Sequence, residues 1–242
     1  MTETIIERPS PNCRERDPGS VIDTLVLHYT GMQSGEAAIE RLCDPEAAVS
    51  SHYVVEEDGR IFRLVPEHLR AAHAGISFWR GRSMLNDTSI GIEIVNPGHE
   101  WGYRPFPAAQ IEAVRRLCVG ILARHPIPPI GVVAHSDIAP DRKQDPGELF
   151  PWAALAASGI GIYPSAPPDP GTGDVVTDAE RMHPVRQALI RIGFDIETEG
   201  ALDEKLMLVL TAFQRHWRPE AVNGRADHGT RARAAALALL VP

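Results

Sequence analysis

A histidine, a lysine and an aspartate stand close together near the middle of this sequence, at His135, Lys143 and Asp145. The apolar run 131–134 before the histidine is typical of a buried strand, and the Pro-, Asp- and Gly-rich stretch after it predicts a loop. A neutral imidazole and a carboxylate are ligands that Zn²⁺ accepts, and a nearby lysine can stabilise negative charge on a substrate. The loop therefore predicts part of a zinc site, whose third protein ligand must come from elsewhere in the chain.

His28 is the best candidate for that third ligand. It follows the apolar residues 25–27 of a predicted strand over 24–30, so it ends a buried strand in the same way as His135. Single histidines are seldom ligands, but functional residues gather where strand ends meet loops. Together with Asp145 the two histidines give a His-His-Asp set, which leaves a fourth position on zinc for water.

A glutamate interrupts a strand that is otherwise built for burial. The segment 89–96 is apolar at alternate positions but carries Glu93 at its centre. Burying a carboxylate is unfavourable unless the group is paired or functional. Glu93 is therefore a candidate general base, with Lys143 as the stabiliser of a developing oxyanion. The alternative is a buried structural ion pair between Glu93 and Lys143.

Strand and helix patterns alternate along the first two thirds of the chain. This order predicts an α/β domain with a mixed central sheet flanked by helices, preceded by an irregular lead-in over residues 1–20. Strands are expected over 24–30, 51–55, 61–65, 89–96 and 131–134, and helices over 36–42, 107–124 and 152–157.

A segment with four Pro and two Gly, residues 164–174, indicates a linker. It divides the chain into a catalytic domain over 1–163 and a small helical domain over 175–242, and it predicts that a chain ending near Tyr163 folds by itself. Three short helices around one small core are expected in the second domain, with Gly193 as a C-cap and Asp227 as an N-cap. Their ranges are 182–192, 202–217 and 229–240.

Composition excludes several classes of protein. The formal net charge is −8 with no long basic run, so nucleic acid is not expected as a partner. Three widely spaced Cys argue against a disulfide framework and against a CxxC metal knuckle. No apolar run is long enough to span a bilayer, and the N-terminus lacks the apolar core of a signal peptide, which favours a cytoplasmic location.

Five motifs, in register, resemble the zinc-dependent N-acetylmuramoyl-L-alanine amidases. They are LVLHYT, SSHYVVEEDGRI, AAHAG, LNDTSIGIEIVN and VVAHSDIAPDRKQDPG, and together they cover roughly residues 20–155. That family shares its fold with the peptidoglycan recognition proteins and includes recycling enzymes of the AmpD type. The resemblance implies hydrolysis of the amide bond between N-acetylmuramic or anhydro-N-acetylmuramic acid and L-alanine in peptidoglycan fragments, in cell-wall turnover and recycling.

The resemblance also implies roles for individual residues. The zinc ligands are then His28, His135 and Asp145, Glu93 is the catalytic acid/base, and Lys143 is the transition-state cation. The residue that matches a position at the substrate groove is His73, and further candidates for lining it are Tyr29, Trp79 and Arg82.

The C-terminal segment carries a second resemblance. VRQALIRIGF and LTAFQRHW are similar to the three-helix peptidoglycan-binding domain. A wall-binding appendage favours a periplasmic location, against the cytoplasmic one that the N-terminus indicates. The alternative for this segment is a plain helical bundle used for dimerisation, because Leu, Phe and Trp at helical spacing are ordinary core residues.

Two other functions are compatible with such a fold. Non-catalytic peptidoglycan recognition proteins are binding-only members that lack a zinc ligand, whereas this sequence has all three. A zinc peptidase acting on the stem peptide needs a pattern such as HExxH, and this sequence has none. Catalysis on peptidoglycan or muropeptides is therefore favoured, and no protein partner is implied.

Overall fold

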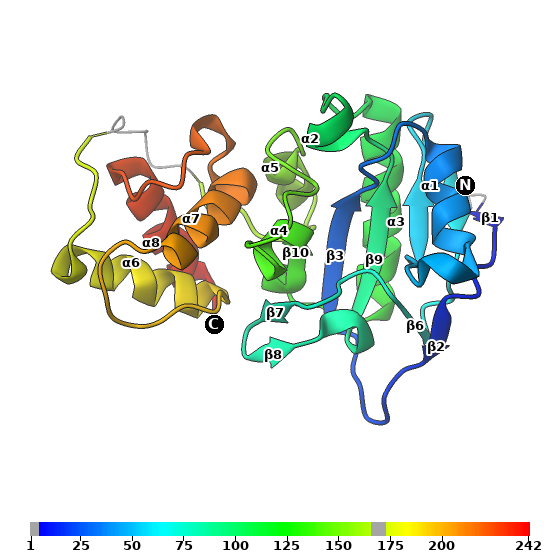
Figure 1. The fold of residues 1–242 in the computed structure, drawn as a ribbon, viewed down its shortest axis with the longest axis horizontal. Coiled ribbons are helices and arrows are strands. Elements are labelled where there is room, and N and C mark those ends of the chain that lie inside the picture. Colours follow the sequence, from blue (N-terminus) through cyan, green and yellow to red (C-terminus); the bar gives the residue numbers. More distant parts are fainter. Residues whose placement is uncertain (1–4, 166–172) are drawn as a thin grey trace.

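The computed structural model describes residues 5–165 and 173–242, and it confirms the α/β architecture with a mixed sheet. A six-stranded sheet occupies the centre of the first described part, residues 5–165, which we call the α/β unit (Figure 1). Neighbouring strands β4, β9, β3 and β10 are parallel, β5 runs antiparallel to β4, and β1 pairs in parallel with β5. In spatial order the strands are β1 (Ile5–Glu7), β5 (Ile61–Arg63), β4 (Tyr53–Val55), β9 (Ser89–Ile94), β3 (Thr24–Tyr29) and β10 (Val132–Ala134).

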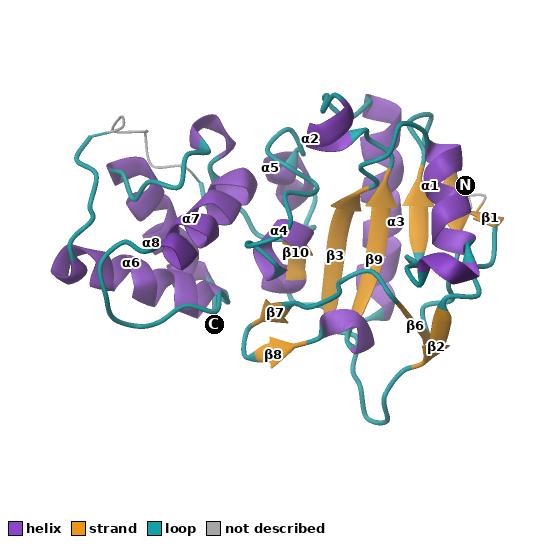
Figure 2. Cartoon of the chain, viewed as in Figure 1, coloured by secondary structure: helices purple, strands orange, loops and turns teal. Residues whose placement is uncertain are grey.

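Helices pack on the sheet because successive strand residues point to opposite faces. Helix α3 (Ala108–Arg124) runs along one face, where its apolar side chains pack with Leu25 and Leu27 (Figure 2). Helix α1 (Gly35–Cys43) buries Ile39 and Leu42 with strand β4. The shorter helices are α2 (Gly98–Trp101), α4 (His135–Ile138) and α5 (Trp152–Ala157). Over the described residues, no helix combines the length and apolarity needed to cross a membrane.

The expected irregular lead-in is wrong in part, because residues 1–20 include two short strands. Strand β1 extends the main sheet, and β2 (Cys13–Glu15) pairs with β6 (Leu69–Ala71). Three-residue strands have no periodicity to detect, and their partners lie far along the sequence. A further two-stranded hairpin, β7 (Phe78–Trp79) with β8 (Arg82–Ser83), was also not predicted.

The three predicted C-terminal helices are confirmed as α6 (Ala179–Ile192), α7 (Glu204–Trp217) and α8 (His228–Leu240). Each begins at an aspartate whose side chain accepts a hydrogen bond from a backbone N–H three residues on, which satisfies one free donor of the first turn. These caps are Asp178, Asp203 and the predicted Asp227. Gly193 ends α6 as predicted, with a φ of 147°.

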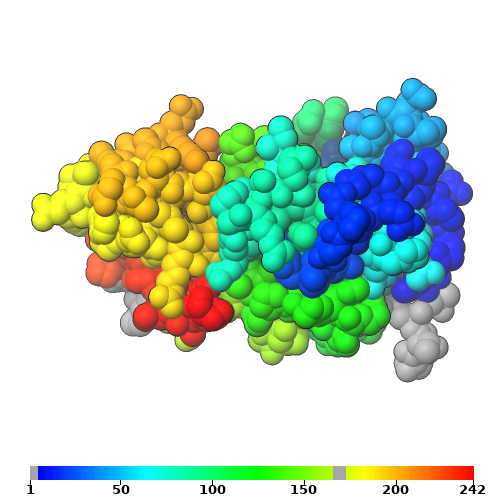
Figure 3. Space-filling model, turned by 90° about the horizontal axis from the view of Figure 1, so that it is seen from below, coloured from blue at the N-terminus to red at the C-terminus, as the bar shows by residue number. Residues whose placement is uncertain are grey.

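The helical unit, residues 173–242, packs directly against the α/β unit. One hydrophobic cluster joins Val26, Trp79 and Ile138 of the α/β unit to side chains of all three C-terminal helices. The ring of Trp79 meets that of Phe194 edge to face, with centroids 5.1 Å apart. Helix α7 lies against α4 and α5, and Figure 3 shows the yellow-to-red surface of the helical unit in contact with its neighbour. The predicted linker 164–174 falls largely on residues 166–172, outside the described residues, so its boundaries stay a prediction.

This shared apolar interface changes the result expected from truncation. A chain ending at Tyr163 uncovers Trp79 and Ile138, which are 3% and 2% exposed in the full chain. Uncovering a large apolar side chain costs about 1.5–3 kcal/mol, so we expect the melting temperature to fall by about 10 °C. Calorimetry of the full and shortened chains measures this difference. Equal melting temperatures would instead support the independent domain that the Pro/Gly segment predicts.

Candidate active site

Three neighbouring parallel strands bring three of the predicted residues to one edge of the sheet. Strand β3 lies between β10 and β9, with Leu27 paired with Ala134 and His28 paired with Glu93. His135 comes directly after Ala134, so it stands beside His28. The carboxyl ends of parallel strands meet at one sheet edge, and there His135, His28 and Glu93 form a row.

The loop after His135 folds back to add a carboxylate to this row. The backbone N–H of Ser136 donates to the carbonyl of Asp145 at 3.0 Å, which places the aspartate beside the histidine. Asp145 Oδ2 lies 3.1 Å from His28 Nδ1 and 3.0 Å from His135 Nδ1, and the two nitrogens are 2.9 Å apart. All three residues are buried. The three predicted ligands thus converge on one point.

Hydrogen bonding sets the tautomer of His135. Its Nε2 lies 3.2 Å from the carbonyl oxygen of Ala74. A carbonyl only accepts, so Nε2 carries the proton and Nδ1 keeps its lone pair. This is the arrangement in which an imidazole binds a metal ion, with the other ring nitrogen held by an outer partner.

A chain of hydrogen bonds sets the tautomer of His28 in the same way. Ser89 Oγ donates to the Leu85 carbonyl at 2.7 Å, so it can only accept from His73 Nε2, 3.2 Å away. His73 Nδ1 is then unprotonated and accepts from His28 Nε2 at 3.0 Å. That leaves the lone pair on His28 Nδ1, facing His135 and Asp145. His73 therefore holds the ring of His28 in place, and it also lines the cavity described below.

Gly91 and His52 fix the position of the His73 ring. A Cβ atom at Gly91 would lie 2.5 Å from that ring, so a larger residue has no room there. The Gly91 N–H donates to His52 Nδ1 at 3.0 Å, and His52 Nε2 bonds the Leu69 carbonyl at 3.1 Å. His52 thus holds strand β9, in line with a structural rather than a ligating role.

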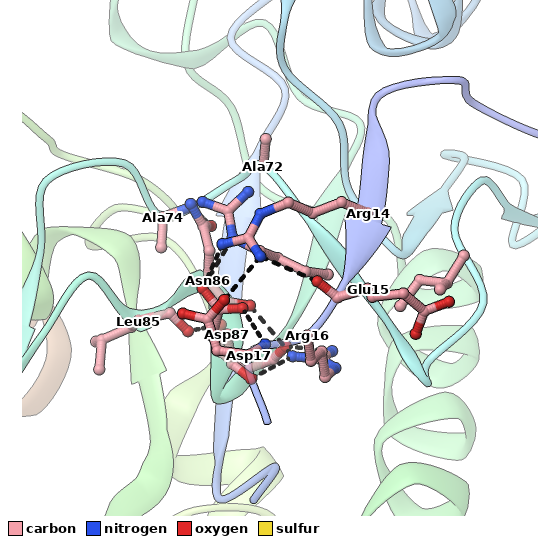
Figure 4. Close-up of polar contacts among 12 residues, drawn as sticks. Arg14, Glu15, Arg16, Asp17, Ala72, Ala74, Leu85, Asn86 and Asp87 are labelled. Carbon is pink, nitrogen blue, oxygen red and sulfur yellow. Dashed lines mark hydrogen bonds and ion pairs between the residues drawn. The ribbon is translucent and has the colours of Figure 1, made fainter. Parts of the chain in front are cut away.

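Sequence reasoning missed the residues that anchor this network from outside. Asn86 Oδ1 accepts from the N–H groups of His73 and Ala74 at 3.0 and 2.8 Å. Arg16 in turn donates to the carbonyls of Asn86 and Asp87 (Figure 4). The signal available in the sequence was the LNDTS motif, but the arginine that binds it lies about 70 residues earlier.

The electrostatics of the cluster suit a divalent cation. Burial, followed by repulsion from His135, lowers the pKa of His28 to about 4, and burial also lowers the pKa of His73 well below its usual range. Burial alone would raise the pKa of Asp145, but His135 and His28 outweigh it and lower that pKa. The tautomers set by Ala74 and His73 direct two lone pairs at the Asp145 carboxylate, and the three ligand atoms lie about as close as the roughly 3.3 Å between ligands of tetrahedral zinc. The residues fit a zinc ion.

Glu93 and Lys143 line a cavity of about 470 Å³ together with His135 and Asp145. Glu93 Oε2 is buried and has no hydrogen-bond partner within the described part of the chain. Burial, reinforced by repulsion from Asp145, raises the pKa of Glu93 well above its ordinary value, while Lys143 acts in the opposite direction. An unpartnered carboxyl group facing a cavity is available to exchange a proton with a bound molecule.

The remaining predicted groove residues divide into two groups. Tyr29 and His73 line the same cavity, and the Tyr29 hydroxyl lies 3.0 Å from His99 Nδ1. Trp79 lies elsewhere, buried against the helical unit, with its Nε1 donating to the Ile130 carbonyl at 3.0 Å. Arg82 is exposed and pairs with Asp23. Both side chains lie beside residues that precede β3 and β10, Asp23 and Ile130, and so at the other end of these strands from His28 and His135.

Comparison with known proteins agrees with this geometry. Residues 18–148 match the family model described as N-acetylmuramoyl-L-alanine amidase. N-acetylmuramoyl-L-alanine amidase AmiD of Escherichia coli is 42% identical, over 89% of this chain and 82% of AmiD. The 1,6-anhydro-N-acetylmuramyl-L-alanine amidase AmpD of the same organism is 35% identical, over 60% of this chain and 86% of AmpD.

Solved structures resemble this chain over most of its length. E. coli AmiD, in complex with anhydro-N-acetylmuramic acid-L-Ala-D-γ-Glu-L-Lys, superimposes with a TM-score of 0.78 at 41% identity, covering 93% of this chain and 92% of AmiD. AmpDh3 of Pseudomonas aeruginosa gives a TM-score of 0.77 at 33% identity, with 95% and 96% covered. Fold and site define an enzyme that hydrolyses amide bonds. The chain belongs to the N-acetylmuramoyl-L-alanine amidase family, as its motifs predict.

Proposed function

We propose that this amidase depends on zinc and cleaves the amide bond between N-acetylmuramic or anhydro-N-acetylmuramic acid and L-alanine in peptidoglycan fragments. The observation that carries the proposal is the convergence of His28 Nδ1, His135 Nδ1 and Asp145 Oδ2 beside Glu93. The substrate follows from the relatives, since AmiD was solved with an anhydro-muramyl tripeptide and AmpDh3 with anhydromuramic pentapeptide.

His28, His135 and Asp145 would hold the zinc ion through the three atoms that face one another. Zinc, when bound, lowers the pKa of water from about 15.7 towards 7 and polarises a carbonyl group. The hydrogen bonds to Ala74 and His73 keep both imidazoles in the tautomer that this requires.

Glu93 moves the proton in the reaction. It takes a proton from the attacking water as the new C–O bond forms, and returns it to the L-alanine nitrogen as the amide C–N bond breaks. The products are a muramyl carboxylate and a free amino group. The raised pKa of Glu93 makes it a stronger base than an ordinary carboxylate. Lys143 stabilises the oxyanion between these steps, a contribution of about 3 kcal/mol for one such donor.

Mass spectrometry of the products tests the proposal. Wild-type chain is incubated with soluble anhydro-muropeptides and with intact sacculi, with and without a chelator. We expect free stem peptides that begin with L-alanine and are absent when the chelator is present. Intact substrate under all conditions would indicate a recognition protein, and cuts within the stem would indicate a peptidase. Cleavage of soluble fragments alone would support a recycling role in the cytoplasm, whereas release from sacculi would support the periplasm.

Lys143→Met removes the cation with little change in volume. Because its partner charge forms only in the transition state, we expect kcat to fall by about 100-fold while KM stays within a few-fold. Steady-state kinetics on a soluble muropeptide measures both constants. Lys205→Met is the matched control, since Lys205 is exposed and pairs with Asp195 in the helical unit. A rise in KM without loss of kcat would assign Lys143 to substrate binding instead.

A further inference from the structure

The end of helix α7 in the helical unit reaches the segment 135–148, which begins with helix α4 and carries two of the proposed ligands, His135 and Asp145. His216 Nδ1 lies 2.6 Å from Asp137 Oδ2, and both side chains are almost completely buried. The imidazole is stacked between Trp152, at a centroid distance of 3.7 Å, and Trp217, at 3.6 Å. The ring is thus held in one plane, with its Nδ1–H directed at the carboxylate.

Asp137 connects this contact to His135. The same Oδ2 atom accepts from the backbone N–H of Ala134 at 2.8 Å. Ala134 precedes His135 and Asp137 follows it by two residues, so one carboxylate oxygen closes the turn around the ligand. The position of that oxygen depends on His216, which comes from the other unit of the chain.

A second contact from α7 lies on the Asp145 side of the loop. Arg215 donates to Gln144 Oε1 at 3.1 Å and pairs with Glu148 at 3.6 Å. Gln144 and Glu148 flank Asp145 in the sequence. Adjacent residues of one helix therefore hold the loop next to both of its ligands.

We infer that His216 is a positioning residue for the metal ligands, and that the helical unit thereby forms part of the catalytic centre. The inference rests on the proposed zinc function. The alternative is that the His216–Asp137 hydrogen bond only stabilises the interface between the two units and leaves the geometry of the ligands unaffected. Loss of a group that hydrogen-bonds a metal ligand directly typically weakens metal binding by about 10–100-fold; His216 acts one contact farther out, through Asp137, so the lower end of this range is expected.

Zinc affinity of full-length variants distinguishes the two roles. His216→Phe keeps a ring between the two tryptophans but loses the donor. His216→Asn loses the ring but places an amide N–H near the position of Nδ1, whereas His216→Gln places it farther out. In competition with a chelating dye, we expect zinc to bind about 10-fold more weakly to the Phe and Gln variants, and within about threefold of wild type for Asn.

Arg80→Ala is the matched control at the same interface. Arg80 donates to the Arg191 carbonyl at 3.1 Å, away from the 135–148 segment, so its zinc affinity should equal that of wild type. The inference would be overturned if the Phe and Gln variants bound zinc as tightly as wild type. It would also be overturned if the Arg80 control lost as much zinc affinity as they do. If the Phe variant does not fold, the comparison of Asn with Gln decides.

Hydrogen exchange provides a readout that does not need the metal. In metal-free chain we expect backbone amides of 136–148 to exchange faster in His216→Phe than in wild type or Arg80→Ala. Unchanged exchange there would overturn the positioning role. Wild type that binds no zinc would instead contradict the proposed function, while the exchange result would still decide whether His216 orders the loop.

Discussion

Glu93→Gln is expected to lower kcat by about 100-fold to 10,000-fold, the usual contribution of a positioned acid–base group. Glutamine keeps the shape of the side chain but cannot accept a proton at neutral pH. Oε2 has no hydrogen-bond partner to lose among the residues that the structure describes, so the fold and the zinc content should be close to normal. Steady-state kinetics, metal analysis and thermal melting measure the three quantities.

The alternative reading of Glu93 is a structural ion pair with Lys143. Breaking such a pair would cost about 3–5 kcal/mol and lower the melting temperature by about 10 °C. The raised pKa of Glu93 predicts the opposite effect on stability: removing the carboxylate should not lower the melting temperature. When the pKa of a carboxyl group is higher in the folded chain than in the unfolded chain, the folded protein loses stability as pH rises from the ordinary pKa through the raised one. At neutral pH, metal-free Glu93→Gln should therefore be at least as stable as wild type. A large fall in melting temperature with normal turnover would reject the catalytic role.

The pH profile gives an independent check on Glu93. Its base form must be present for water to lose a proton, so wild-type activity should fall as pH falls through the pKa of Glu93, which burial raises and a bound zinc ion would lower. The residual activity of Glu93→Gln should lack that acid limb. Matched profiles in the two chains would assign the limb to another group.

Asp145→Ala is expected to weaken zinc binding by roughly 1,000-fold and to abolish turnover, because two nitrogen ligands remain where three ligand atoms converged. The same loss is expected for His28→Ala, which also removes the partner of His73. Metal analysis after gel filtration and activity with added zinc measure the effect. Asp141→Ala is the matched control, since Asp141 is an exposed acid in the same loop. Full activity in stably metal-free chain would contradict the zinc proposal.

The sequence by itself determined the chemistry-bearing residues and the local elements that carry them. His28, Glu93 and His135 were recognisable because each is a polar side chain in or at the end of an apolar strand, and that pattern is local. The same holds for the three C-terminal helices and for the caps Asp227 and Gly193, which depend only on nearby residues. The five motifs added the family, and the comparisons confirmed it.

Only the tertiary structure decided which side chains meet. The row of His135, His28 and Glu93 follows from strand order. The chain of hydrogen bonds from His28 to Leu85 follows from the fold of the 73–89 segment. Arg16 reaches that segment, at the carbonyl of Asn86, from the N-terminal part of the chain. Trp79 looked like a groove residue, yet it lies under the helical unit. The physical reason is that residue type and periodicity are properties of a short segment. The neighbours of a buried side chain are instead set by contacts between segments far apart in the chain, such as that of His216 with Asp137.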